Sequence, residues 1–314
     1  MGGIHHVTAI AGNPGKNFAF YTQTLGLRFV KKTVNFDDPG TYHFYYGDEA
    51  GRPGTILTFF PWEHAAPGRG GVGLAQTTAF RAPEASIGFW THRLVEKGVK
   101  HDAPVKQFGE TVVSFSDPDG MSLALVGVAG ADAQSAWAAG GIPAEHAIRG
   151  FHGVTLLLDT SDKTGAILTD VFGFVEAGRE GTTVRYIADG GSKTNLGGVV
   201  DIREAGDFLP GRMGRGSVHH VAFRALNDSE QAEMARKLVQ KHGLHPTEQK
   251  DRQYFRSIYF REPGGILFEI ATDEPGFAVD EPLATLGHDL KLPGFLESRR
   301  KDLEAILPSL EAAA

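Results

Sequence analysis

The sequence predicts an α+β fold in which four βαβββ modules form two curled sheets, each shaped like a cup. The chain has 314 residues and 41% hydrophobic content, which is enough for two domain-sized units with their own cores. A pattern of one alternating strand, one amphipathic helix and two or three further strands occurs four times. Because a single such unit leaves one sheet face uncovered, the units must pair to form cups.

The first two modules occupy about 3–62 and about 75–128. The first opens with the strand IHHVTAI and continues into a helix in which Phe18, Tyr21 and Leu25 recur at helical spacing. It closes with the strands of YHFYYGDEAGRPGTILTFFPW. The second module repeats this order with QTTAFRA, the helix ASIGFWTHRLVEKG, and TVVSFSDPDGMSLALVGV.

The last two modules follow an Ala/Gly-rich linker near 129–145. The third opens with FHGVTLLL and ends near Ile202. The fourth has the strand SVHHVAFRAL, a helix from Ser229 to a stop at Gly243, and the strands RSIYF and ILFEIAT across the turn REPGG. The periodicity predicts that this helix buries a face made of Ala232, Ala235, Leu238 and Val239.

These repeats predict an N-terminal pair of modules over 1–130 and a C-terminal pair plus a C-terminal tail over 146–314. The strand openings IHHVT, FHGVT and VHHVA align, as do the turns DPDG (117–120) and EPGG (262–265).

Composition excludes several classes of function. With no cysteine, the chain has no disulfides, thiolate metal sites or cysteine nucleophiles. The net charge of -7 is spread along the chain, so no basic stripe is available to bind nucleic acid. Neither a membrane-length apolar run nor a signal-peptide pattern is present, which predicts a cytoplasmic protein without a membrane partner. A homo-oligomer is compatible with the sequence.

Strand alternation predicts a metal site. It separates His5 from His6 and His219 from His220, and it sets Glu269 apart from the apolar face of its strand. If the apolar faces pack against the helices, then His6, His220 and Glu269 all face one cup. A buried carboxylate needs compensation, and two imidazoles with one carboxylate are typical of non-heme iron(II) oxygenases. Ligands from the first and fourth modules place the site between these two modules.

Comparison of the modules supports this choice of ligands. The position of His6 is Gly153 in the third module, and the position of Glu269 is Ala124 in the second and about Thr58 in the first. The repeat therefore does not itself require polar residues there. The other histidines are interpreted as ordinary surface or core residues: His43, His64, His92, His101, His146, His152, His242, His245 and His288.

The chain resembles the vicinal oxygen chelate superfamily, and within it the ring-cleaving dioxygenases that act on hydroquinones. The resemblance is carried by IHHVT, VKKTVNFDDPGTYHFYYGDEAGRPGT, GSVHHVAF and DRQYFRSIYFREPGGILFE, and spans nearly the whole chain. It implies iron(II) on the three ligands, although manganese(II) suits the same ligand set. It also implies that four further residues lie near the metal or substrate: Thr8, His219, Arg252 and Tyr259.

Strand parity treats these neighbours differently. It supports Thr8 and opposes His219, and for Arg252 a surface salt bridge near Asp251 is an equal alternative.

For Tyr259, pairing Arg261 with Ile266 across the turn places Ile258, rather than Tyr259, opposite Glu269. A bulge would be needed to reverse this order.

The expected activity is extradiol-type cleavage of a dihydroxylated aromatic ring, with a small diol and O2 as the reactants. Two alternatives stay open: a glyoxalase-type metal isomerase or lyase, and a non-enzymatic aromatic-ligand binding (resistance) protein. The isomerase needs a fourth protein ligand, for which the sequence offers no clear carboxylate. Resistance proteins of this superfamily generally lack the metal triad. A hydroquinone would need a partner for its distal hydroxyl, for which Arg252 and Tyr259 are candidates.

Overall fold

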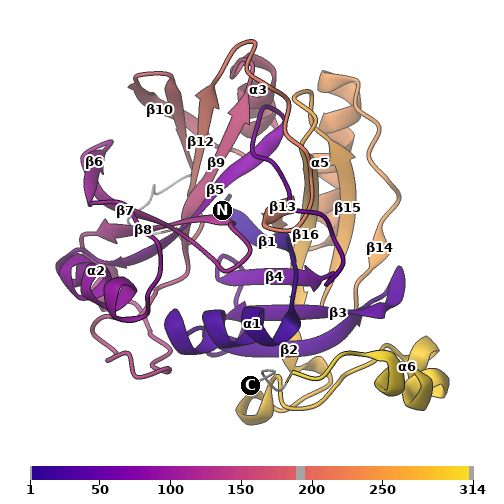
Figure 1. Cartoon of the computed structure of the whole chain (residues 1–314). Helices are drawn as coiled ribbons and strands as arrows, with labels where there is room; N and C mark the ends of the chain where they lie inside the picture. Colours follow the sequence, from indigo (N-terminus) through magenta and orange to yellow (C-terminus); the bar gives the residue numbers. More distant parts are fainter. Residues whose placement is uncertain (1, 189–194, 311–314) are drawn as a thin grey trace.

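The computed structural model describes residues 2–188 and 195–310, in which sixteen strands form two eight-stranded sheets (Figure 1). The first sheet contains β1 (Ile4–Ala11), β2 (Arg28–Asn35), β3 (Asp38–Gly47), β4 (Ile56–Pro61), β13 (Ser217–Ala225), β14 (Lys250–Asp251), β15 (Phe255–Arg261) and β16 (Leu267–Pro275). Its order is β14-β15-β16-β13-β1-β4-β3-β2. Strands from the first and fourth modules therefore share this sheet.

The second sheet combines the strands of the second and third modules. It contains β5 (Leu74–Pro83), β6 (Val105–Gln107), β7 (Glu110–Ser116), β8 (Ser122–Val128), β9 (Phe151–Leu158), β10 (Val175–Glu180), β11 (Thr183–Ile187) and β12 (Val199–Glu204). Its order is β10-β11-β12-β9-β5-β8-β7-β6. At the centre of each sheet two modules meet through an antiparallel pair, β1 with β13 or β5 with β9. The predicted α+β architecture of two curled sheets is confirmed.

Helices pack on the same sides of the sheets as the apolar core, away from the cups. They are α1 (Pro14–Ala19), continued by a π-helical turn over Phe20–Thr24, and α2 (Ile87–Glu96), α3 (Asp162–Asp170), α5 (Asp228–His242) and α6 (Arg300–Ile306). Figure 1 shows α5 alongside β15 and β16. No helix in the described parts of the chain is long and apolar enough to span a membrane.

Helix α5 has the predicted ends but buries a partly different face. Asn227 caps its start by accepting a hydrogen bond from the backbone N–H of Glu230, and Gly243 ends it in the left-handed conformation. The buried side chains are Gln231, Met234 and Leu238. The prediction was therefore correct for Leu238 but wrong for Ala232 and Val239, which are exposed, and Ala235 is half-buried. Gln231 is buried because its amide donates to the backbone carbonyls of Arg256 and Ile270.

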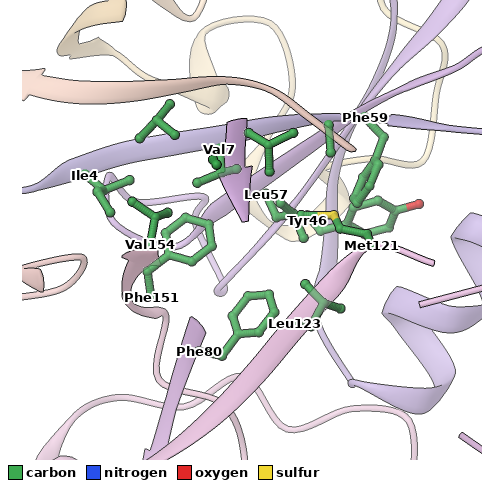
Figure 2. Packing of buried hydrophobic residues seen from close by; sticks show 14 of the residues in the cluster. Ile4, Val7, Tyr46, Leu57, Phe59, Phe80, Met121, Leu123, Phe151 and Val154 are labelled. Atoms are coloured by element: carbon green, nitrogen blue, oxygen red, sulfur yellow. The ribbon is translucent and has the colours of Figure 1, made fainter. Parts of the chain in front are cut away.

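The main apolar core lies between the backs of the two sheets. Figure 2 shows Ile4, Val7 and Leu57 of the first sheet facing Phe80 and Phe151 of the second. All five are fully buried. Because the backs are covered in this way, the opposite faces of the sheets form the cups.

The C-terminal segment closes one end of the first cup. Phe277 contacts the rings of Tyr45 and Tyr254, with centroids 5.0 and 4.9 Å away. The ammonium of buried Lys31 lies 2.6 Å from a carboxylate oxygen of Asp280 and 2.5 Å from one of Glu281. These ion pairs fix the tail to β2.

Candidate metal centre

Three buried side chains converge inside the first cup: His6 of β1, His220 of β13 and Glu269 of β16. The imidazole Nε2 atoms are 3.2 Å apart. Oε2 of Glu269 lies 3.0 Å from Nε2 of His220 and 3.3 Å from Nε2 of His6. The exposed fractions of the three residues are 2%, 5% and 0%. Among the described residues, they form the one cluster of three or more histidine, aspartate or glutamate side chains that could hold a metal ion.

The donor set fits a divalent metal ion. Oε1 of Glu269 accepts a hydrogen bond of 2.5 Å from Ser257, but Oε2 is buried without a well-directed hydrogen bond. Ligand atoms about 2.1 Å from a common metal would be about 3.0 Å apart at right angles and about 3.4 Å apart in a tetrahedron. The three separations lie within this range, so the lone pairs can share one ion.

The protonation states suit metal binding. Burial lowers the pKa of His220, which favours the neutral imidazole required of a ligand. Burial alone would raise the pKa of Glu269, but the adjacent His6 and His220 outweigh it and hold that pKa well below the usual value. The carboxylate is therefore ionised.

The doublet partners His5 and His219 lie beside the candidate ligands. Nδ1 of His5 is 2.9 Å from Nδ1 of His6, and Nδ1 of His219 is 2.8 Å from Nδ1 of His220. When Nε2 of a ligand binds a metal, its Nδ1–H is free to donate to this partner, as is usual for metal-binding histidines. His5 and His219 can therefore fix the orientation of the ligand rings.

The expected separation of each doublet across the sheet was wrong. In the β1–β13 ladder the register shifts between Ile4 and His6 and again opposite Val218 to His220, so His5 and His219 are bulged residues. A bulge breaks strict alternation, which is the reason why parity misplaced His219. Its ring lines the cup, and burial lowers its pKa to about 3.

Thr8 is fully buried but does not line the pocket. Its hydroxyl accepts a hydrogen bond of 2.8 Å from Thr58. Thr8 pairs with Thr58 just as Ala222 pairs with Glu269, and these pairings make Thr58 the first-module equivalent of Glu269. The predicted correspondence is confirmed.

The predicted register at Tyr259 was wrong. Arg261 pairs with Leu267 rather than Ile266, which places Tyr259 opposite Glu269. The backbone N–H of Glu262 donates to the carbonyl of Ile266, so the turn is one residue tighter than expected.

Arg252 reaches the pocket from the segment between β14 and β15. Its Nε donates to the hydroxyl of Tyr259 at 3.2 Å, and Nη2 forms an ion pair of 2.8 Å with Asp37 rather than with the neighbouring Asp251. Both Arg252 and Tyr259 line the pocket.

The pocket around the three ligand atoms has a volume of about 340 Å³. Its walls are largely aromatic, with Phe36, Phe60, Trp62, His43, Tyr45 and Phe255. His5, His43 and Tyr45 were not selected from the sequence. The His5–His6 doublet in the sequence could have indicated His5 as a pocket residue. His43 and Tyr45 can be recognised as pocket residues only when β3 is aligned with β15.

Comparisons with known proteins agree with this geometry. The sequence matches the Glyoxalase/Bleomycin resistance protein/Dioxygenase superfamily over residues 3–125 and 140–270. The chain belongs to this superfamily, and the resemblance to vicinal oxygen chelate proteins is confirmed.

Several relatives are similar along almost their whole length. Two Bacillus subtilis proteins, named "Putative ring-cleaving dioxygenase MhqO" and "Putative ring-cleaving dioxygenase MhqE", are 45% and 46% identical over 307 and 308 residues, covering 96% and 99% of the relatives and 98% of this chain. A Sphingobium indicum protein, named chlorohydroquinone/hydroquinone 1,2-dioxygenase, is 32% identical over 96% of this chain and 94% of its own.

Solved structures share the fold. A Bacillus subtilis structure described as a "putative dioxygenase" is 44% identical, covers 98% of this chain and 97% of its own, and has a TM-score of 0.92. Glyoxalase I from Zea mays is 13% identical over 92% of this chain and 98% of its own, with a TM-score of 0.66. The maize enzyme supports the fold alone.

Proposed function

We propose that the protein is an iron(II)-dependent, extradiol-type dioxygenase that opens a hydroquinone- or catechol-type ring with O2. The convergence of His6, His220 and Glu269 in the lining of an aromatic pocket carries this proposal. The names of the full-length relatives support ring cleavage, and one of them names hydroquinone substrates.

His6, His220 and Glu269 would hold the metal. Three protein ligands leave open positions for other molecules, as in other sites with two histidines and a carboxylate. When bound, iron(II) supplies the redox chemistry that activates dioxygen and the Lewis acidity that favours ionisation of a ring hydroxyl. Manganese(II) prefers similar ligands and is the alternative ion.

The pocket walls orient the ring and exclude water. Phe60 and Trp62 stack at a centroid distance of 5.5 Å on one wall, and Phe255 lies 4.9 Å from the ring of His6. A flat aromatic substrate is held between such walls with its hydroxyl directed to the ligand atoms.

Thr58 argues against the glyoxalase-type alternative. That reaction uses a fourth protein ligand, and Thr58 occupies the position that mirrors Glu269. Its hydroxyl donates to Thr8 and is therefore not a substitute for a carboxylate.

Oxygen uptake by the iron-loaded protein tests the proposal. With a panel of diols we expect one O2 consumed per ring opened, and labelled dioxygen should place both oxygen atoms in the product. The metal-free protein is the control. Tight diol binding without oxygen uptake would instead indicate a binding protein.

A second experiment tests substrate preference. A hydroquinone presents only one hydroxyl to the metal, so its second hydroxyl can bond to Arg252 or Tyr259 across the pocket. We expect Arg252→Ala and Tyr259→Phe to reduce hydroquinone turnover by about tenfold or more, with less effect on catechol. Arg256→Ala is a matched control, because Arg256 pairs with Asp228 outside the pocket. Better catechol turnover by the wild type, with both variants unimpaired on hydroquinone, would refute the preference.

A further inference from the structure

The cup wall opposite Glu269 carries a second tyrosine in an equivalent position. Tyr45 of β3 pairs with Thr58, as Tyr259 of β15 pairs with Glu269. The two tyrosines are therefore related by the internal repeat, and both line the pocket. Of the two tyrosines, only Tyr259 pairs with a candidate metal ligand.

The residue two positions before the tyrosine is not the same in the two modules. Ser257 precedes Tyr259 and donates a hydrogen bond to Glu269. His43 precedes Tyr45, and its ring lies between two hydroxyl groups. Nδ1 of His43 is 2.8 Å from the Tyr45 hydroxyl, and Nε2 is 2.9 Å from Oγ1 of Thr58.

The direction of these hydrogen bonds follows from Thr58. Its hydroxyl hydrogen is donated to Thr8, so Thr58 must accept from Nε2–H of His43. A neutral imidazole with hydrogen on Nε2 has a free lone pair on Nδ1. Nδ1 therefore accepts a hydrogen bond from the hydroxyl of Tyr45.

The pair is fixed in place and faces the pocket. Tyr45 is 2% exposed, and the ring of His43 lies 4.1 Å from that of Tyr45 and 4.4 Å from that of Phe60. Burial and the facing groups His6, His220 and Arg252 lower the pKa of His43 well below its usual value, and Glu269 only partly opposes them, so the ring is neutral before substrate binds. Nδ1 of His43 already accepts the hydroxyl hydrogen of Tyr45, so this proton can move to Nδ1 when a phenolate forming in the pocket offsets the facing cations.

We propose that Tyr45 and His43 form the proton-accepting pair for the diol substrate. A substrate hydroxyl gives its proton to the oxygen of Tyr45 while the hydroxyl proton of Tyr45 passes to Nδ1 of His43. The products are a phenolate in the pocket, a neutral tyrosine and an imidazolium whose Nε2–H stays bonded to Thr58. A phenolic hydroxyl in water ionises only near pH 10, so this acceptor favours binding of the ionised ring at neutral pH.

This inference rests on the proposed function, and proton counting tests it without turnover. Hydroquinone is titrated anaerobically into the metal-loaded protein at pH 7, in buffers with different ionisation enthalpies, and the binding heats give the protons released. In the wild type the proton stays on His43. The ultraviolet spectrum of the bound ring shows at the same time whether it is the monoanion. The wild type should bind the monoanion without releasing a proton, whereas His43→Gln and Tyr45→Phe should either bind the neutral diol or release about one proton per monoanion bound.

Metal analysis accompanies each titration. If His43→Gln does not fold, Tyr45→Phe still tests the pair, because it removes only one oxygen atom. His92→Gln, at an exposed position on α2, is the matched control and should give the wild-type count. We also expect kcat to fall by about 10²-fold in both variants, with KM changed less. Binding of the monoanion by both variants with no more proton release than in the wild type would overturn the pair. Failure of the wild type to bind hydroquinone would overturn the proposed function, and the pair with it.

Discussion

In the fourth module, which forms part of the first cup, β13 carries His220 and the neighbouring β16 carries Glu269. In the third module, which forms part of the second cup, the equivalent positions of β9 and β12 hold Gly153 and Asp201. The registers establish this correspondence: Asp201 pairs with Thr155 of β9 as Glu269 pairs with Ala222 of β13. Both cups therefore present a carboxylate at the same place in the fold.

The two carboxylates differ in their partners. Asp201 accepts two hydrogen bonds of 2.8 Å from Arg185, which also donates to Glu110 at 2.8 Å. Glu110 in turn lies 3.0 Å from Nε2 of His152, a bulged residue like His219. These charges compensate one another, whereas Glu269 has imidazoles and an unsatisfied oxygen. The position alone does not make a metal site, because the neighbouring side chains decide whether a cation is needed.

The largest expected effect is a loss of metal on substitution of Glu269 but not of Asp201. Glu269→Ala should lose both the metal and the oxygenase activity, because two imidazoles no longer form a three-ligand site. Asp201→Ala and His152→Ala should keep about one metal ion per chain. Metal analysis after anaerobic preparation is the measurement.

Full metal retention by Glu269→Ala would show that the ligand set is wrong. Metal loss in Asp201→Ala, in a folded protein, would show that the second cup contributes to binding.

A second prediction tests whether the second cup has room for a histidine at Gly153, the position equivalent to the candidate metal-ligand histidines. A Cβ atom at Gly153 would lie 2.1 Å from the backbone oxygen of Val199. Gly153→Ala should therefore destabilise the protein by about 1–3 kcal/mol in chemical denaturation. Gly88→Ala is the control with the opposite sign, since Gly88 lies in α2 with open space around it. If Gly153→Ala is as stable as wild type, steric exclusion does not explain the missing histidine.

A smaller effect follows from the ion pairs of the second cup. Burial would raise the pKa of Glu110, but His152 and Arg185 outweigh it and lower that pKa to about 2. The stabilisation from ionised Glu110 is therefore complete above its unfolded pKa of about 4.5, and is lost as the pH falls through about 2. Relative to wild type, Glu110→Gln should lower Tm by about 2–5 °C at pH 7, and less at pH 3. A pH-independent difference would contradict this assignment, and metal content at pH 7 should not change.

Sequence reasoning succeeded where regular alternation holds. The bulges lie on the N-terminal side of His6 and His220, whereas the ladder is regular from each histidine to the following valine and around Glu269, so parity placed all three correctly in the cup. It failed at His219, because a bulge cannot be recognised from the strand pattern. It failed at Tyr259 because the turn length fixes register, and a shift of one residue reverses every side chain.

Long-range contacts account for the other differences. Gln231 occupies the buried face of α5 because carbonyl groups of two strands accept its amide hydrogens, and the helix periodicity contains no sign of these partners. The role of His43 depends on Thr58, 15 residues away, and on the register of β3 with β4. Neither can be derived from local sequence.

We expect the first cup to hold the metal and the second cup to hold none. A crystal of iron-loaded protein measured at the iron absorption edge tests this directly. We expect one anomalous peak per chain, within bonding distance of His6, His220 and Glu269, and none near Asp201. A peak beside Asp201 and His152, or iron bound by the chain without a peak at the triad, would contradict it.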